Sequence, residues 1–447
     1  MSTSQMTRRR FIGTSSASLA AIVTTDALAA EGRPRVTDPR ATDGDDRQQP
    51  NWDERMTITV GNREAELVGR DDKVIQAAVD YTARMGGGTV RILPGTYTLR
   101  NSVYLPSKIR IQGSGAETIV TKIASRTIEL SEDSDWYDQE ITLSDGQGFR
   151  VGDGVALLAK NSATGAQEVI KRTLVARTGK RFKLNDGLRE NLWLTGKPTC
   201  SSLFPLFTSE YTSDVWIENI ALDGNKANND NFDGNYGGCI FLQDCNRYTI
   251  RGVETRNYNG DGISFQICHD VIVEDCYSHD NTDLGVHPGS GSQRPLIRNN
   301  KIEKNNIGLF WCWGVKYGLA ENNKLDANTT GISIGHADTD NLMRNNVITN
   351  SGQVGILFRI VGGGEAFWPD RNTVERNRII NSGGEAGVAI DIQGKTKDLR
   401  IVGNDIREMR EPMKRIGIRI DKQAGNIELT NNTIEGFATA IADNRTS

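Results

Sequence analysis

One histidine, one arginine and several aspartates stand close to a series of short apolar runs. His287 lies two residues after Gly285, Arg359 lies four residues after Gly355, and Asp261 directly precedes another such glycine. A histidine can take up or release a proton near neutral pH, whereas an arginine keeps its charge and can neutralise an anion. We therefore predict an acid–base site whose candidate catalytic residues are His287, Arg359, Asp261, Asp338 and Asp391.

The runs belong to a repeat between Val271 and Arg371. In each copy an aliphatic-polar run ends in Asn-Asn, as in Leu319-Ala-Glu-Asn-Asn-Lys-Leu325, and a glycine then opens a second apolar run. A period of about 20 to 50 residues is typical of a solenoid or a propeller. Aligned polar side chains at the corners can hydrogen-bond along the axis. The expected corner column is Asn219, Gly252, Asp275, Asn300, Asn323, Asn346, Asn377, Asn404 and Asn432.

The Gly-initiated runs predict one parallel sheet with a distinct outer face. Side chains alternate between the two faces of a strand, and the first and third residues after each glycine are mostly apolar, so we expect them in the core. Equivalent outward side chains in neighbouring coils then lie about 4.8 Å apart. The expected outward columns are Ser264, His287, Phe310, Ser333, Leu357, Ala389 and Arg419, and Gln266, Gly289, Cys312, Gly335, Arg359, Asp391 and Asp421.

Two insertions interrupt the repeat, at Asp223 to Gly237 and at Val361 to Arg371. Insertions in repeat scaffolds gather on the binding face, so we expect these two to flank a groove across the sheet. Under the alternative interpretation, the polar residues are ordinary corner residues and the aromatic residues only pack. The candidate ligand-binding residues beside the groove are Gln266, Arg294, Trp313, His336, Glu365 and Trp368.

Composition and charge narrow the class of protein. The 447 residues include 47 glycines and 11 prolines, and 6% are aromatic, which suits many short strands with tight corners. The formal net charge is -4. A mildly acidic chain lacks the basic face that binds nucleic-acid phosphates, so we expect no nucleic-acid partner. The sequence leaves the number of subunits open.

The first residues predict export. Thr7-Arg-Arg-Arg-Phe-Ile-Gly13 resembles a twin-arginine signal, an apolar stretch follows, and Ala27-Leu-Ala29 fits a cleavage site. The alternative is a basic tail with chance apolar residues. We expect residues 1–29 to be a signal peptide, residues 30–52 a disordered linker, and the mature protein to work in a periplasm or outside the cell. The apolar stretch is too short for a membrane span.

Six cysteines occur, and five of them fall inside the repeats. Export permits disulfides, but no pair has metal-site spacing and connectivity cannot be read from sequence. We expect stacked cysteines in the core, at positions 200, 239, 245, 268, 276 and 312.

The start of the mature chain carries a family resemblance. Asp71 and Asp72 can begin a helix containing Ile75-Gln-Ala-Ala-Val-Asp80, and Gly86 can end it. Two short strands follow in Gly86-Gly-Gly-Thr-Val-Arg-Ile-Leu-Pro-Gly-Thr-Tyr-Thr-Leu99. This order resembles the start of the pectate-lyase-like right-handed parallel β-helix superfamily. The resemblance implies an all-β fold over residues 53–447, a single-stranded right-handed solenoid whose open end the helix plugs.

Residues 120–205 break the period of the coils. Their alternating runs, such as Phe149 to Leu158 and Glu168 to Ala176, are typical of antiparallel strands. We expect a small β subdomain inserted between early coils, covering one side of the solenoid and carrying no recognisable chemical motif.

The resemblance implies a polysaccharide or oligosaccharide as partner, and two reactions fit that partner. In a lyase, His287 would remove the proton next to a uronate carboxylate that Arg359 or Arg294 neutralises. In a glycoside hydrolase, two carboxyls flank the scissile bond, and Asp261, Asp338, Asp391 and Glu365 are the available acids. Trp313 and Trp368 would stack on sugar rings.

The chain departs from the best-known signatures of the superfamily. Val215-Trp-Ile-Glu-Asn219 and Arg294-Pro-Leu-Ile-Arg298 only approach the two calcium pectate lyase segments. Gly260-Asp261-Gly262 and Val286-His287-Pro288 resemble the paired motifs of polygalacturonases, but lack the second aspartate and the flanking glycines. The epimerase motif Asp-Pro-His is missing. The choice between lyase and hydrolase therefore stays open.

A different class of function also stays open, because exported β-helices also serve as non-catalytic glycan binders or surface scaffolds. No cofactor is expected from the sequence, and no zinc-type set of ligands occurs. Calcium is the one metal that fits, since hard oxygen ligands such as those of Asp338 and Asp340 suit it.

Overall fold

The computed structural model describes residue 32, residues 50–161 and residues 164–445. The chain divides into two compact units, Met1–Arg33 and Pro34–Ser447, and nearly all of the described structure belongs to the second. The predicted signal peptide and most of the predicted linker lie outside the described residues. Among the described residues, no helix has both the length and the apolar content that crossing a membrane requires.

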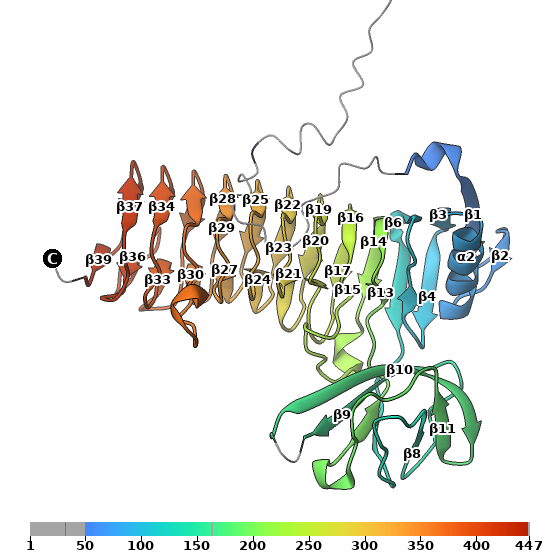
Figure 1. The fold of residues 1–447 in the computed structure, drawn as a ribbon. Helices are drawn as coiled ribbons and strands as arrows, with labels where there is room; N and C mark the ends of the chain where they lie inside the picture. The colour runs from blue at the N-terminus through green and yellow to red at the C-terminus, as the bar shows by residue number, and fades with distance from the viewer. Residues whose placement is uncertain (1–31, 33–49, 162–163, 446–447) are drawn as a thin grey trace, which may run out of the picture. The chain divides into compact units, whose positions relative to one another are not determined.

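Two columns of parallel strands form the largest sheet, in which each coil pairs with the next (Figure 1). The columns share two long strands, β6 and β14, near the beginning of the stack. The 22 strands of this sheet are β1 (Met56–Gly61), β2 (Leu67–Val68), β3 (Gly88–Ile92), β4 (Gly95–Leu99), β6 (Ile109–Lys122), β14 (Ser213–Asp223), β16 (Asn246–Arg251), β17 (Glu254–Arg256), β19 (Ile272–Glu274), β20 (Tyr277–His279), β22 (Leu296–Arg298), β23 (Lys301–Glu303), β25 (Leu319–Glu321), β26 (Lys324–Asp326), β28 (Leu342–Arg344), β29 (Val347–Thr349), β31 (Thr373–Glu375), β32 (Arg378–Ile380), β34 (Leu399–Val402), β35 (Asp405–Arg407), β37 (Ile427–Thr430) and β38 (Thr433–Glu435).

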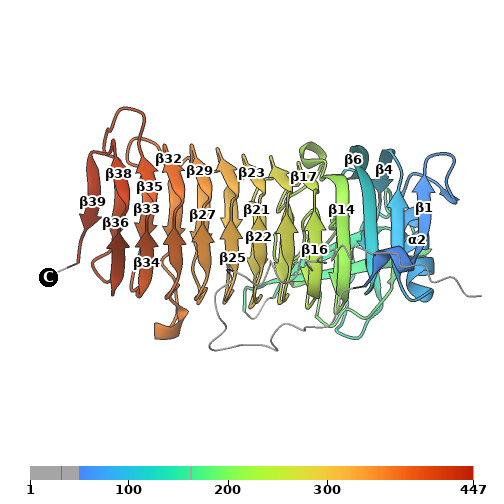
Figure 2. The same cartoon turned by 90° about the horizontal axis from the view of Figure 1, so that it is seen from above.

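The Gly-initiated runs form a second parallel sheet, as predicted (Figure 2). Its inward residues, such as Ile332 and Ile334, belong to the continuous apolar core of the solenoid. Ser333 between them points away from the core and accepts a hydrogen bond from the Arg359 guanidinium, which confirms the alternation. The 11 strands are β5 (Val103–Tyr104), β13 (Phe207–Glu210), β15 (Ile240–Gln243), β18 (Ile263–Gln266), β21 (Leu284–Gly289), β24 (Ile307–Phe310), β27 (Thr330–Ile334), β30 (Val354–Phe358), β33 (Val388–Ile392), β36 (Ile416–Ile420) and β39 (Thr439–Asp443).

Helix α2 (Asp72–Arg84) closes the first coils, where it packs against β1 and β3. Asp71 is the N-cap, and its side chain accepts a hydrogen bond from the Val74 backbone N–H. The helix buries Ile75, Ala78 and Val79 against the core. The structure thus places a helix where the family resemblance implies one. Short 3-10 helices are η1 (Trp52–Glu54), η2 (Leu194–Gly196), η3 (Lys226–Asn228) and η4 (Glu365–Phe367).

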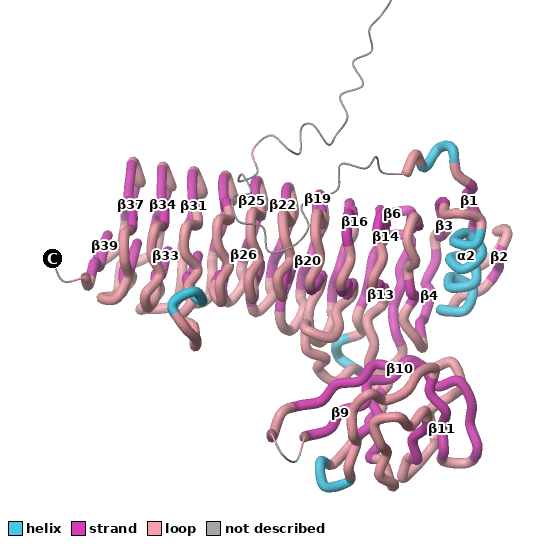
Figure 3. Tube along the Cα trace, in the orientation of Figure 1, coloured by secondary structure: helices cyan, strands magenta, loops and turns pink. Residues whose placement is uncertain are grey.

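A separate antiparallel sheet occupies the segment that breaks the period. Its strands can be followed in Figure 3. The sheet has a buried core of its own, built around residues such as Phe149, Leu174 and Phe182. The alternating runs of the sequence indicated three of these strands, at 154–160, 167–178 and 181–184. The six strands are β7 (Thr127–Glu129), β8 (Glu140–Thr142), β9 (Gly154–Lys160), β10 (Gln167–Thr178), β11 (Arg181–Leu184) and β12 (Thr199–Ser201).

Buried asparagines link successive coils in a ladder. The side-chain Nδ2 of Asn323 donates to Oδ1 of Asn346 at 2.9 Å, and the backbone N–H of Asn323 donates to the same oxygen. The second Nδ2 hydrogen donates to a backbone carbonyl of an earlier coil, so each amide is saturated. The ladder runs through Asn300, Asn323, Asn346, Asn377, Asn404 and Asn432.

The predicted beginning of this ladder was wrong by one residue. Cys276, and not Asp275, pairs in register with Asn300, and the Cys276 backbone N–H donates to Asn300 Oδ1. Asn219, Gly252 and Asp275 instead belong to the neighbouring corner position, where the backbone is left-handed with φ between 51° and 59°. Both corner positions favour asparagine, so sequence spacing alone did not separate them.

The register of one strand also differs from the prediction. Leu357 pairs with Asp391, and Ala389 takes the place of the glycine that begins the other runs. Asp391 therefore belongs to the outward column that begins with Ser264, between Leu357 and Arg419, and Ala389 does not. The prediction aligned Gly387 with Gly355, but Ala389, two residues later in the chain, occupies that position.

Four cysteines lie in the solenoid core as predicted, Cys200 lies in the core of the inserted sheet, and the core position predicted for Cys312 was wrong. Five are buried and Cys312 is partly exposed, and all six are free thiols. Cys245 and Cys268 stack on adjacent coils, with the Cys245 backbone N–H 3.4 Å from Cys268 Sγ.

Replacing Asn346 by alanine should lower the thermal unfolding midpoint, because it leaves the Asn323 amide and the Asn346 neighbours without partners in the core. Each unsatisfied buried group costs about 1–3 kcal/mol. The matched control is Asn306→Ala, which removes an exposed asparagine of the same solenoid. Equal midpoints for the two variants would contradict a stabilising ladder.

Candidate functional site

A buried aspartate holds the imidazole of His287. His287 Nδ1 lies 2.8 Å from Asp261 Oδ2 and 3.4 Å from Ser264 Oγ, which belongs to the preceding coil. Asp261 is fully buried and its other oxygen accepts the Leu284 backbone N–H. Burial raises the pKa of Asp261, while the hydrogen bond and charge of His287 oppose the rise. The pair joins two residues that the sequence predicted as catalytic.

The other nitrogen of this imidazole is available for chemistry. Because the Asp261 carboxylate accepts the Nδ1 proton, Nε2 carries the free lone pair. Nε2 is buried and forms no hydrogen bond within the described part of the chain. A histidine fixed by a carboxylate at one nitrogen and unpartnered at the other has the arrangement of a general base.

Arg359 reaches back along the outer face toward the same place. It begins one coil beyond Ser333, donates to Ser333 Oγ at 2.8 Å and donates to the Trp311 carbonyl at 2.9 Å. Its guanidinium lies 4.3 Å from the centre of the Phe310 ring, and His287 contacts the same ring edge-on at 5.1 Å. Phe310 thus separates the base from the cation. We call Asp261, Ser264, His287, Phe310 and Arg359 the imidazole site.

Glycines allow side chains to lie along the outer face. A Cβ at Gly335 would come within 2.8 Å of the Arg359 guanidinium, and a Cβ at Gly289 would come within 2.3 Å of the Gln266 amide. Gln266 also donates to Ser264 Oγ at 3.1 Å, so this predicted ligand-binding residue lies beside the imidazole site.

Asp338 lies behind Arg359, with Oδ2 3.7 Å from the guanidinium. It is buried, and it accepts backbone N–H groups of Gly314, Val315 and Gly335. Burial raises the pKa of Asp338 to about 7 against these bonds and the Arg359 charge. Asp338 therefore positions Arg359 and this corner, and its carboxyl is not open to a ligand.

The first insertion covers the imidazole. Ser264 Oγ donates to the Gly234 carbonyl at 2.6 Å, and a Cβ at Gly234 would come within 1.7 Å of Asp261 Oδ2. His287, which contacts Asp261, Ser264 and Phe310, is only 2% exposed. The expectation that both insertions merely flank an open groove was wrong for this one, because Gly234 allows its backbone to lie directly on the site.

The second insertion builds an aromatic cluster at the far end of the face. Trp313 stacks on His336 with ring centres 4.9 Å apart, and Phe367 of η4 meets Trp313 edge-on. Trp313 is 51% exposed, so it presents a free ring surface. Burial lowers the pKa of His336, and Arg359 adds to this effect.

Four predicted residues lie apart from the imidazole site. Arg294 pairs with Asp270 at a corner, and Asp391 pairs with Arg419. Glu365 pairs with Lys395. The prediction of Trp368 as a sugar platform was wrong: it is 8% exposed, and a Cβ at Gly394 would meet its ring. Such pairings depend on neighbouring coils, which sequence spacing does not show.

Calcium stays a prediction. Asp340, the second candidate ligand, accepts two hydrogen bonds from Arg371. Among the described residues, no group of three or more His, Cys, Asp or Glu side chains is placed to hold a metal ion.

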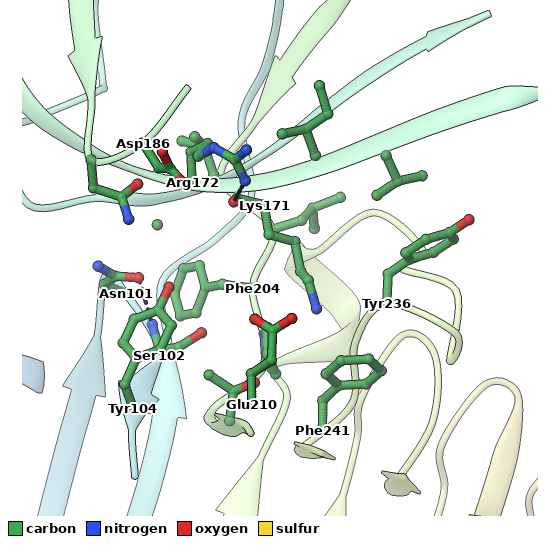
Figure 4. A pocket seen from close by; sticks show the side chains of 18 of the residues that line it. Asn101, Ser102, Tyr104, Lys171, Arg172, Asp186, Phe204, Glu210, Tyr236 and Phe241 are labelled. Atoms are coloured by element: carbon green, nitrogen blue, oxygen red, sulfur yellow. Dashed lines mark hydrogen bonds between the residues drawn. The ribbon is translucent and has the colours of Figure 1, made fainter. Parts of the chain in front are cut away.

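A second concave site was missed by the sequence analysis. A cavity of about 500 Å³ lies between the inserted sheet and the first strands of the 11-stranded sheet (Figure 4). The inserted strand β10 supplies two basic residues to it. No sequence signal brought these segments together, because they are far apart in the chain and share no motif. We call this cavity the insertion pocket, lined among others by Tyr104, Lys171, Arg172, Glu210, Tyr236 and Phe241.

Comparison with known proteins supports the fold. A family model described as "Right handed beta helix region" matches residues 218–359. The mannuronan C-5 epimerase AlgE6 A-module of Azotobacter vinelandii has a TM-score of 0.53 at 17% identity, over 84% of this chain and 92% of that chain. Bacteriophage phi29 gene product 12 also scores 0.53, at 12% identity, over 84% of this chain and 45% of that chain. No curated protein sequence matches. The chain folds as a right-handed parallel β-helix.

Replacing Gly234 by alanine should uncover the imidazole, because the new Cβ cannot coexist with Asp261 Oδ2 in the present position of the segment. We expect faster hydrogen exchange at residues 232–238 and faster acylation of His287 by diethyl pyrocarbonate, both measured by peptide mass spectrometry.

The control is Gly364→Ala in the second insertion, where a Cβ would meet nothing within 4 Å. If Gly234→Ala left both rates at the wild-type values, the first insertion would not be the cover of His287.

Proposed function

We propose that the protein binds an acidic polysaccharide along the outer face of the 11-stranded sheet and cleaves it by β-elimination. The observation that carries this proposal is the arrangement of His287, whose Nδ1 bonds to Asp261 while Nε2 has no described partner. In this reaction Nε2 removes the C5 proton next to a uronate carboxylate, and Arg359 neutralises the negative charge that develops on that group. The C4–O bond to the leaving sugar breaks as the C4=C5 double bond forms, and the leaving oxygen takes up a proton from solvent.

The carboxylates of the face favour elimination over hydrolysis. A glycoside hydrolase requires two carboxyl groups on either side of the scissile bond. Asp261 is bound to His287, Asp338 is enclosed by backbone donors, and Asp391 is paired with Arg419. The face instead has a base and a cation on either side of Phe310. These two groups suit proton removal next to a carboxylate better than they suit glycoside hydrolysis.

The fold supports a carbohydrate ligand. The structurally similar module of Azotobacter vinelandii is a mannuronan C-5 epimerase by its name, and its low identity transfers no residue roles to this chain. The exposed ring of Trp313 offers a stacking surface at the far end of the same face. Both features are compatible with a long chain that crosses several coils.

The coverage of His287 favours a second candidate, a glycan-binding protein without turnover. An imidazole that is 2% exposed reaches a substrate only after the first insertion moves. If the insertion stays in place, the outer face binds a glycan without cleaving it, and the His287–Asp261 pair only stabilises the fold.

Replacing His287 by asparagine should abolish cleavage while the fold remains intact. The amide can still contact Asp261 but cannot act as the base, and general bases contribute about 10²–10⁴-fold to the rate. Activity is measured on polygalacturonate and alginate by ultraviolet absorbance of the unsaturated product, and folding by thermal unfolding.

The matched control is His279→Asn, since His279 belongs to the other sheet and stacks on Tyr277. Full activity of the His287 variant would exclude the proposed base. Glycan binding by the wild-type protein without any product would identify the non-catalytic candidate.

A further inference from the structure

The insertion pocket is a built cavity with walls from separate parts of the chain. Strands β5, β13 and β15 supply Tyr104, Glu210 and Phe241, strand β10 supplies Lys171, and the first insertion supplies Tyr236. Its volume of about 500 Å³ falls within the range of ordinary small-ligand sites, about 300–1,000 Å³. Figure 4 shows Lys171 and Glu210 extending into the same space from opposite sides.

Lys171 brings a positive charge into the pocket without a fixed counter-ion. Its ammonium lies 3.8 Å from the centre of the Phe241 ring. Within the described residues it forms neither a hydrogen bond nor an ion pair, although Glu210 acts on it electrostatically. Burial lowers the pKa of Lys171 to about 8. A desolvated ammonium that lacks a protein carboxylate is stabilised by a carboxylate from a ligand.

Neighbouring groups provide acceptors, donors and a ring surface. Glu210 pairs in register with Gln243, so the two side chains project side by side into the pocket from adjacent coils. A carboxylate accepts hydrogen bonds from hydroxyl groups, and an amide both donates and accepts. Tyr104, on the neighbouring strand of the same sheet, is 44% exposed and can pack against the apolar face of a sugar ring.

Arg172 holds one wall in shape. Its guanidinium donates to the carbonyls of Gly187 and Leu188, which fixes the loop that follows β11. It also donates to the Lys171 carbonyl at 2.7 Å. The arginine therefore stabilises the wall and leaves Lys171 as the cation free to meet a ligand.

We propose that the insertion pocket is a second carbohydrate site, which binds one hexuronate residue with its carboxylate on Lys171 and its hydroxyl groups on Glu210 and Gln243. A single carboxylate on a ring of hydroxyl groups matches one free cation beside acceptor and amide groups. The ligand class follows from these groups and does not depend on the reaction at His287.

The test is calorimetric binding of trisaccharides of galacturonate and of mannuronate to the full-length chain, with the corresponding neutral trisaccharides as comparison. The measurement uses the His287→Asn variant, so that no turnover disturbs it. We expect acidic sugars to bind and neutral sugars to bind at least about tenfold more weakly. The affinity for the acidic trisaccharides should fall as the pH rises, because Lys171 then loses its proton and its positive charge.

Lys171→Met keeps the apolar stem over Phe241 and removes the charge. It should therefore lower the affinity for acidic trisaccharides at least about tenfold and leave the affinity for neutral trisaccharides unchanged. The matched control is Lys183→Met, an exposed lysine of the same inserted sheet that does not line the pocket. If Lys171→Met does not fold, the wild-type protein with reductively ¹³C-methylated lysines gives the answer, because the Lys171 resonance should shift with acidic sugar alone.

Equal binding of acidic and neutral sugars, no binding of either, or an unchanged affinity in Lys171→Met would overturn the proposal. These outcomes are distinct from a failure of the proposed reaction, which is measured as product formation and involves His287. An inactive protein that binds acidic sugars through Lys171 would support the second site alone.

Discussion

Parallel stacking of the coils is the constraint on which the rest of the structure depends. Each residue of one coil lies about 4.8 Å from the same position of the next coil, so a buried polar group must find its partner along the axis. The asparagine ladder meets this condition with one amide per coil, each bonded to the next amide and to backbone. A charge or an unpaired amide at that position would be left without a partner in the core.

The same constraint creates the imidazole site. Ser264 and His287 are in register on adjacent strands, so their side chains are neighbours without any special loop. Arg359 starts from a more distant coil and reaches Phe310 only because Gly335 leaves room along its path. The functional side chains of this face therefore extend along the solenoid axis. They pass over neighbouring coils that have small residues, such as Gly335, at the equivalent positions.

The period and the strand alternation were sufficient to predict the solenoid and most of its core positions, and the sequence named both Asp261 and His287 as candidate catalytic residues without predicting their hydrogen bond. They were insufficient where the chain changes the length of a coil. Asp391 was assigned to the wrong column because the register of the strand at 388–392 lies two residues later than Gly387 indicates. The burial of Trp368 and the formation of the insertion pocket both depend on contacts between segments far apart in the chain. A local sequence pattern does not predict such contacts.

The first insertion joins the two sites physically. Gly234 lies on Asp261, and Tyr236, two residues later, lines the insertion pocket. A movement of Gly234 away from Asp261 would act on the backbone two residues before Tyr236. A ligand that packs against Tyr236 therefore acts on the same backbone that closes the imidazole site. The exposure of the base and the shape of the pocket are consequently linked through residues 234–236.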